Sequence, residues 1–523
     1  LTAGNGSGAY DLIVQQYSSG TLTIGSAIVD NAANATAFTK AGPGALVLTG
    51  SSTFTGAMSV NSGTVVLGSA GRLGASGTYS GAIALATDSQ LFFNSSANQT
   101  FGGAISGYGT LLKSGSGTLT LTGASTLVGP MVVSSGTLVL NNNSAGAGAG
   151  GVVLGDAATG TNAVALMSNN GSDPTVNITV SPLGTGSVTI GSNGGGAVNH
   201  IYSGTITLNR PTTLLALDTD RTSYTSLITG SVGTLTIAGN RTTLDNAGNN
   251  FVGDIVVQSG TLQVNAAGAI PDLSGVTLAG PSSSLFLNLV SGSTETIGSL
   301  SGTTTAVASV HPGVTGYQTL AVGANNASTT FAGTMGNGGG TFALTKIGTG
   351  TLTLTGSSTF TGTTTISAGA LEIAGAGQLG TGGTYATAIF NNATLRVATT
   401  AAQTLSGAIS GTGQLVKASS GLLVLSGSNS YTGGTLLAGG SLELGSTDAI
   451  GTTGTISFTG GTLRYSSSNA LDYSSRFSQS ANQAVSIDTN GRDVSVATAL
   501  ASAGGTLAKS GSGTLVLPVN NSY

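Results

Sequence analysis

The feature that most constrains this chain is a phrase that begins at each of its lysines. The 523 residues include only five lysines, and each one opens a copy of the same phrase, as in LTKIGTGTLTLTGSSTFTG at residues 344–362. Leucine stands six and eight positions after every lysine, and a large residue stands 14 positions after it. Nine residues later, in four of the copies, a glycine opens a second phrase. A fifth second phrase, SGTLQV, follows Phe251 without a lysine. Repetition at a fixed spacing is typical of solenoid proteins. The lysines are Lys40, Lys113, Lys346, Lys417 and Lys509.

Inside each phrase the pattern has a period of two. In TLTLTG, leucine alternates with threonine, so the two residue types point to opposite sides of an extended strand. The flanking glycines supply the positive φ that tight bends need. No apolar stripe with helical spacing is sustained, and Gly, Thr, Ser and Val are weak helix formers. The pattern predicts many short strands joined by tight turns.

The composition excludes several classes of protein. The chain is 39% hydrophobic and has a net charge of only −4, whereas disordered chains combine low hydrophobicity with high net charge. Its 87 glycines do not recur every third residue, as collagen requires. The absence of cysteine excludes disulfides and thiolate metal sites. No apolar run approaches the ~20 residues of a membrane-spanning helix.

The repeat spacing predicts an all-β fold, a right-handed parallel β-helix with short loop excursions. Successive lysines are 73, 233, 71 and 92 residues apart, and a unit of this length suits roughly three coils. Coils stack at about 4.8 Å, so identical charges would repel, whereas Thr, Ser and Asn ladders exchange hydrogen bonds. We expect about 20 or more coils. Three segments follow from the phrases: 1–140 with repeats, 141–322 with divergent coils and insertions, and 323–523 with repeats.

These phrases resemble a known family. LTKIGTGTLTLTGSSTFTG and LVKASSGLLVLSGSNSYTG, each followed by its second phrase, look like the autotransporter-associated β-strand repeat, also called the passenger-associated transport repeat. ANQTFGGAISGYG and AAQTLSGAISGTG resemble the segment that usually precedes it. The resemblance implies a secreted β-helical passenger, exported to the surface of a bacterium with two membranes.

Few residues suggest catalysis or metal binding. The only histidines are His200 and His311, which we interpret as turn or loop residues. Asp218 and Asp220 are the closest acidic pair, with a solvated turn as the main interpretation and a calcium or catalytic site as the alternative. We expect no cofactor, and the acidic net charge argues against nucleic acid as a partner.

The lysines themselves allow two interpretations. As a structural device, a charge just before an apolar strand guards against sideways pairing while the chain is still unfolded, and its stem covers apolar surface. As a functional device, a row of lysines along one side could bind anionic polysaccharide.

One island departs from the repeat, at RYSSSNALDYSSRF, residues 464–477. It gathers aromatic, arginine and acidic residues in a chain that is poor in them. Exposed aromatic and arginine side chains favour contact sites, so this island is our candidate for binding a sugar face or a protein. The alternative is a loop packed on its own solenoid. The candidate contact residues are Arg464, Tyr465, Asp472, Tyr473, Arg476 and Phe477.

The sequence therefore predicts a non-catalytic extracellular surface fibre or adhesin. The alternative is a polysaccharide-acting β-helix enzyme. Because an uncovered end coil recruits another strand, we expect both ends to stack on further repeats of the chain or on another copy, head to tail. Surface polysaccharide and the surface of a host or neighbouring cell are the other partners that we consider.

Overall fold

The structure is a computed structural model, and it describes residues 1–4, 8–143, 150–169, 172–194, 199–217, 219, 221–310 and 315–523. Over these residues it consists of short β-strands and two single-turn 3-10 helices, η1 (Ala75–Gly77) and η2 (Ser474–Arg476). Contacts within the chain divide it into an N-terminal unit, Leu1–Asp254, and a C-terminal unit, Ile255–Tyr523. The three segments that we derived from the repeat phrases stay a prediction.

Strands form where the period-two pattern predicts them. In the TLTL phrase at residues 351–354, Leu352 and Leu354 are 1% exposed, while the two threonines that alternate with them face outward and are partly exposed. Each such strand pairs in parallel with the strand one coil before it and the strand one coil after it, so that Leu352 lies between Thr329 and Leu371. The predicted all-β parallel β-helix is confirmed, and the described residues form about 22 turns.

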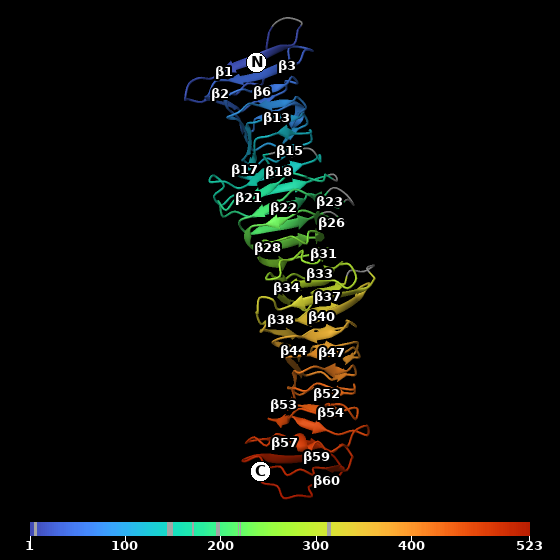
Figure 1. Cartoon of the computed structure of the whole chain (residues 1–523). Coiled ribbons are helices and arrows are strands. Elements are labelled where there is room, and N and C mark those ends of the chain that lie inside the picture. The colour runs from blue at the N-terminus through green and yellow to red at the C-terminus, as the bar shows by residue number, and fades with distance from the viewer. Residues whose placement is uncertain are drawn as a thin grey trace. The chain divides into compact units, whose positions relative to one another are not determined.

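In the N-terminal unit the chain visits three parallel sheets in turn, which we number sheets 1 to 3 (Figure 1). Sheet 1 contains β1 (Tyr10–Gln15), β3 (Thr36–Ala41), β6 (Met58–Val60), β10 (Ile83–Leu85), β13 (Ile105–Gly107) and β16 (Thr126–Leu127). Sheet 2 contains β2 (Leu22–Ile24), β4 (Ala45–Leu48), β7 (Gly63–Ser69), β11 (Ser89–Ser95), β14 (Thr110–Lys113), β17 (Met131–Val133), β19 (Val152–Leu154), β21 (Ile178–Val180), β24 (Ile206–Leu208) and β27 (Ile228–Thr229). Sheet 3 contains β9 (Thr78–Tyr79), β12 (Gln99–Phe101), β15 (Leu119–Leu121), β18 (Gly136–Leu140), β20 (Val164–Ser168), β22 (Val188–Ser192), β25 (Thr212–Ala216) and β28 (Ser231–Gly239). The later coils add sheet 4, with β23 (Asn199–Tyr202), β26 (Arg221–Tyr224) and β29 (Arg241–Leu244), and β5 (Ser51–Ser52) pairs with β8 (Arg72–Leu73).

The C-terminal unit is built in the same way, from sheets 5 to 7 and a shorter sheet 8. Sheet 5 contains the last three residues of β30 (Val252–Val257), β32 (Gly275–Leu278), β35 (Ser299–Gly302), β38 (Thr329–Phe331), β41 (Thr351–Leu354), β44 (Ala370–Gly375), β48 (Thr394–Thr399), β51 (Gln414–Lys417), β53 (Thr435–Leu437) and β55 (Ile456–Phe458). Sheet 6 contains β34 (Thr294–Ile297), β37 (Tyr317–Val322), β40 (Thr341–Lys346), β43 (Thr364–Ile366), β47 (Ile389–Asn391) and β50 (Ile409–Ser410). Sheet 7 contains β46 (Thr384–Tyr385), β49 (Gln403–Leu405), β52 (Leu422–Leu425), β54 (Ser441–Leu444), β56 (Thr462–Arg464), β57 (Ala484–Asp488) and β59 (Thr506–Ser510). Sheet 8 contains β31 (Thr261–Val264), β33 (Ser284–Leu287), β36 (Val307–Val310) and β39 (Thr334–Gly336); the remaining pairs are β42 (Ser357–Ser358) with β45 (Gln378–Leu379) and β58 (Val494–Ser495) with β60 (Leu515–Val516).

The core consists of columns in which each coil places an apolar residue above the one below. The large residue 14 positions after the lysine lies in such a column: Phe54 packs between Phe38 and Tyr79, with ring centroids 5.8 and 5.2 Å away. Phe360 packs in the same way between two aromatic rings. The inner column of sheet 2 runs in register through Leu22, Leu46, Val65, Leu91, Leu111, Met131, Val152, Ile178, Ile206 and Ile228.

Candidate functional site

The repeated lysine lies at the end of a strand with its side chain inside the solenoid. Lys113 is 1% exposed and occupies the inward-facing column of sheet 2, in register with Phe93 below and Val133 above. Its ammonium donates to three backbone carbonyls, those of Ser114 (2.9 Å), Gly115 (3.0 Å) and Ser135 (2.9 Å). An ammonium has three N–H donors, so these three carbonyls, which we call the cradle, can satisfy all of them.

The turn after the lysine explains the glycines of the phrase. Gly115 has a φ of 72° and Gly136, one coil later, has a φ of 76°, both in the left-handed region that glycine adopts without strain. A Cβ atom at Gly136 would lie 2.7 Å from the ammonium nitrogen of Lys113. The glycines therefore let two successive turns bring their carbonyls around one cation.

The cradle recurs at every lysine that has a described coil after it. In each case the ammonium donates to the carbonyls one, two and 22 residues later in the sequence. Lys40 donates to Ala41, Gly42 and Ser62; Lys346 donates to Ile347, Gly348 and Ala368; Lys417 donates to Ala418, Ser419 and Gly439. Lys509, in β59, is exposed and donates to Ser510, Gly511 and the hydroxyl of Thr489.

The polysaccharide interpretation needs the lysine charges on the surface, and the structure contradicts this for four of the five. The other interpretation, a protective role for the charge in the unfolded chain, stays a prediction. Nor do the lysines form a row on one side. Lys40 lies in β3 of sheet 1, whereas Lys113 lies in β14 of sheet 2. After β3 the chain returns to sheet 1 three times, at β6, β10 and β13, and β14 is the next strand, so the spacing of these lysines is not a whole number of coils. Burial also lowers the pKa of Lys113 and of Lys417 to about 8. These lysines are structural cations and do not form a polysaccharide site.

The burial of four lysines predicts a simple labelling pattern. An amine-reactive reagent added to the folded protein should modify the side chain of Lys509 and leave Lys40, Lys113, Lys346 and Lys417 unmodified, because acylation needs access to the nitrogen. Mass spectrometry of proteolytic fragments measures the pattern. Unfolding in denaturant before labelling is the control and should expose all five lysines. Rapid labelling of the four lysines in the folded protein would contradict the cradle.

Two glutamines perform a similar task just before the lysine phrase. The side chain of Gln99 donates to the carbonyls of Leu73, Gly77 and Thr100 and accepts from the N–H of Leu73. Gln403 makes the same four hydrogen bonds in its own repeat. Both glutamines lie in the segments that precede a lysine phrase, and their role was not predicted from the sequence. The sequence did contain a signal for this buried role: a large polar residue stands at a position where the period-two pattern places an inward-facing side chain.

The aromatic residues of the candidate contact island are inside the solenoid, which agrees with the interpretation of a loop packed on its own solenoid and contradicts an exposed aromatic contact site. Tyr465 is 0% exposed, Phe477 packs on Phe458 with ring centroids 5.0 Å apart, and Tyr473 is 6% exposed. The hydroxyl of Tyr473 accepts from Asn469 and donates to the carbonyl of Thr447. The three rings belong to the stretch between β56 and β57, which includes η2.

The polar residues of the island are held by the coils beside them. The guanidinium of Arg476 donates to the backbone carbonyls of Ile450, Gly451, Thr453 and Gly454. The carboxylate of Asp472 accepts from the N–H groups of Ser474 and Ala497. A contact role for the island stays a prediction, limited to the exposed Asp472 and the partly exposed Arg464 and Arg476. An open pocket of about 530 Å³ beside Arg476 is lined by Gly454, Thr455 and residues 475–480.

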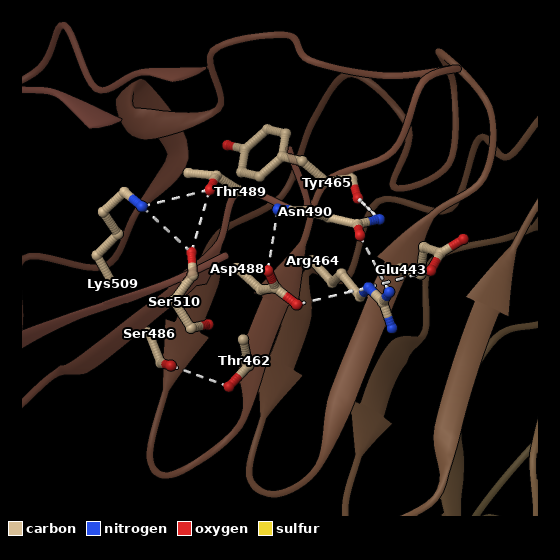
Figure 2. Close-up of polar contacts among 10 residues, drawn as sticks. All are labelled: Glu443, Thr462, Arg464, Tyr465, Ser486, Asp488, Thr489, Asn490, Lys509 and Ser510. Atoms are coloured by element: carbon tan, nitrogen blue, oxygen red, sulfur yellow. Dashed lines mark hydrogen bonds and ion pairs between the residues drawn. The ribbon is translucent and has the colours of Figure 1, made fainter. Parts of the chain in front are cut away.

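Arg464 forms the centre of a charged ladder on the outer face of sheet 7 (Figure 2). Its Nε lies 3.4 Å from Glu443 Oε2 on one neighbouring coil and 3.5 Å from Asp488 Oδ2 on the other. Its Nη2 donates to Asn490 Oδ1 at 3.1 Å. Opposite charges thus alternate along the stack, which avoids the like-charge repulsion that we expected to exclude charge from the outer face.

Of the remaining candidates, only His200 lies within the described residues, and it is not accessible. His200 is 0% exposed, and its Nδ1 lies 3.0 Å from Ser168 Oγ and 3.2 Å from the carbonyl oxygen of Ser172. This Ser–His pair lies in the core, where no substrate could reach it. Asp218, Asp220 and His311 lie outside the described residues. Within the described ranges, no three or more His, Asp or Glu side chains gather as a metal site, and no helix is long and apolar enough to cross a membrane.

The geometry defines a class, a parallel β-solenoid whose repeats are closed by buried lysines that bind backbone carbonyls. The repeats themselves are passenger-associated-transport repeats: the family model matches five times, each match beginning two residues before a lysine, and the predicted resemblance is confirmed. The matches cover residues 38–67, 111–140, 344–373, 415–444 and 507–523. No match was found among curated proteins or among solved structures.

Proposed function

We propose that this chain is the non-catalytic shaft of a secreted passenger, displayed at a bacterial surface as a fibre or adhesin. The observation that supports the proposal most directly is the use of its polar side chains. The lysine ammonium groups and the glutamine amides bind the chain's own backbone, so they stabilise the coil stack and are not available to a substrate. The repeat family and the solenoid fold fit an autotransporter passenger, and that family implies export to the cell surface.

In this role, any partner binds the outer faces of the solenoid. End-to-end stacking on further repeats or on another copy, which the sequence analysis expects, stays a prediction. The same holds for binding to polysaccharide or to the surface of another cell.

Surface display tests the proposal. Bacteria that export this chain fused to an autotransporter secretion domain should adhere to a host-cell layer or to one another more than bacteria that export the secretion domain alone. Adhering or sedimented cells are counted, and protease treatment of intact cells provides the control, because it should remove both the chain and the adhesion. Equal adhesion of the two strains would contradict an adhesive role.

A polysaccharide-acting enzyme is the second candidate, favoured by the two carboxylates on the outer face of sheet 7. Inverting glycosidases separate an acid and a base by roughly 6.5–9.5 Å, with water between them. Glu443 and Asp488 instead lie on either side of Arg464, whose cation interacts with both. We therefore expect the purified protein to leave pectin and alginate intact, as followed by reducing-end release. Cleavage that disappears in Glu443→Gln or Asp488→Asn would favour the enzyme.

A further inference from the structure

The outer face of sheet 2 carries a continuous apolar column. Six consecutive coils place an apolar side chain at the same outward-facing position, and each is partly exposed although its neighbours above and below cover it. The column extends over five steps of about 4.8 Å, or about 24 Å. On the next coils the same position is threonine. The column residues are Val47, Val66, Phe92, Leu112, Val132 and Val153.

The fold itself does not require apolar residues at this position. Counted from the lysine of its own repeat, Val66 occupies the same position as Glu372 and Glu443 in two other repeats. In the next coil, Phe92 corresponds to Arg396, whose Nε lies 2.8 Å from Glu372 Oε1. Two other repeats thus carry an ion pair where this one carries valine and phenylalanine. The apolar column is a property of this surface and not of the repeat.

Uncharged residues border the column on both sides, and seven of the twelve bordering positions carry a polar side chain. The other five are Ala45, Gly68, Pro130, Gly151 and Gly155. Two residues before the column positions, the outward-facing side chains include Thr64, Gln90 and Thr110. Two residues after them stand Asn94 and Ser114. Successive same-face residues along a strand are about 7 Å apart, so the apolar column is one side chain wide except beside Ala45 and Pro130. Hydroxyl or amide groups stand at both edges on the coils of Phe92 and Leu112.

The shape of the column and its lack of charge favour a neutral glycan over a protein, a membrane or a charged polymer as the partner. Apolar patches that contact proteins or membranes usually exceed several hundred Å² and are broad, whereas this column is long and one residue wide. No charged residue stands in the column or in its bordering rows, and the carboxylate beside them, that of Asp156, accepts a hydrogen bond from Ser134. This arrangement provides no cation for an anionic polymer and little attraction for a cationic one. A linear neutral glycan has the matching shape, with C–H faces at the centre of the chain and hydroxyl groups at both edges. The ring of Phe92 and the 68% exposed ring of Tyr108, beside the start of β14, offer aromatic faces for stacking.

We propose that the outer column of sheet 2 binds a linear neutral glycan that lies along the coil stack. Successive sugar rings pack their C–H faces on successive coils, since the coil spacing is close to the length of one ring. Their hydroxyl groups bond to the bordering Thr, Ser, Asn and Gln side chains. This inference rests on the proposed surface role and specifies its ligand.

The test transplants the ion pair of the C-terminal unit into the column. The double variant Val66→Glu/Phe92→Arg reproduces Glu372 and Arg396 on two paired strands, so we expect it to fold like the wild type. A matched control, Ser59→Glu/Ala84→Arg, places the same charges at outward-facing positions on two paired strands of sheet 1. The proteins are compared on an array of neutral linear glucans, mannans and xylans, with polygalacturonate and alginate as anionic probes. Calorimetry follows with oligosaccharides of increasing length.

The wild type and the control should bind a neutral glycan with an affinity that rises with chain length and changes little with salt. The double variant should bind it at least tenfold more weakly, a difference of about 1.4 kcal/mol or more. The inference is wrong if no neutral glycan binds, if only anionic glycans bind, or if the double variant binds equally well. It is also wrong if the double variant abolishes self-association of the wild type, since a second copy then covers the column. Displayed cells that still adhere with the double variant would preserve the proposed function while removing this ligand.

Discussion

Replacing Leu354 by aspartate should lower the free energy of unfolding by at least about 3 kcal/mol. Leu354 is 1% exposed and stacks in register between Phe331 on the coil before and Ile373 on the coil after. An aspartate there leaves a carboxylate in an apolar column, where it must bind a proton or stay unpaired, and both states are unfavourable. Urea unfolding followed by circular dichroism measures the change.

The matched control for this substitution is Thr351→Asp in the same strand. Thr351 is partly exposed and faces outward, opposite Ala370 on the next coil, so an aspartate there should change stability by about 0.5 kcal/mol or less. The comparison separates burial of the charge from its effect on strand propensity. A loss below about 1 kcal/mol for Leu354→Asp would contradict the inward orientation of this column.

The strands and their stacking could be predicted because their cause is local. Alternation of leucine and threonine determines which side of a strand is apolar, and repetition at a fixed spacing can bury such strands only by stacking coils. The lysine was misinterpreted because a charge near a turn is usually solvated. The sequence contained a signal against this, because glycines stand in the turn after Lys113 and at the start of the second phrase. Both of them, Gly115 and Gly136, adopt a positive φ in the structure. These turns direct the carbonyls of Ser114, Gly115 and Ser135 toward the ammonium of Lys113.

The contact island could not be placed correctly from sequence for a different reason. Rarity of aromatic residues elsewhere in the chain made Tyr465 and Phe477 look like surface features. Their burial depends on how the stretch between β56 and β57 packs on the coil beside it, where Phe477 meets Phe458, and no periodic pattern records the path of such a stretch. The apolar column of sheet 2 was hidden as well, because Val66 and Phe92 come together only when the register between coils is known.

Replacing Lys417 by methionine should destabilise the protein by about 2–4 kcal/mol. Methionine keeps an unbranched stem that can occupy the column between Val397 and Leu437, so the packing changes little. It removes the donors that now reach the carbonyls of Ala418 (2.7 Å), Ser419 (2.8 Å) and Gly439 (3.1 Å). Each buried acceptor that loses its donor costs about 1–3 kcal/mol, and the lower cost of burying an uncharged group offsets part of the sum.

Lys509→Met is the control, because Lys509 opens the same phrase but is exposed, and it should change the free energy of unfolding by about 0.5 kcal/mol or less. Urea midpoints and slopes of both variants are compared with those of the wild type, so that a change in stability is distinguished from a change in the surface exposed on unfolding. Equal, small effects at the two positions would mean that water satisfies the carbonyls and that the lysine is dispensable. A large effect at Lys417 alone would show that the lysine holds two successive coils together from inside, which explains why an almost uncharged solenoid retains one cation in each repeat.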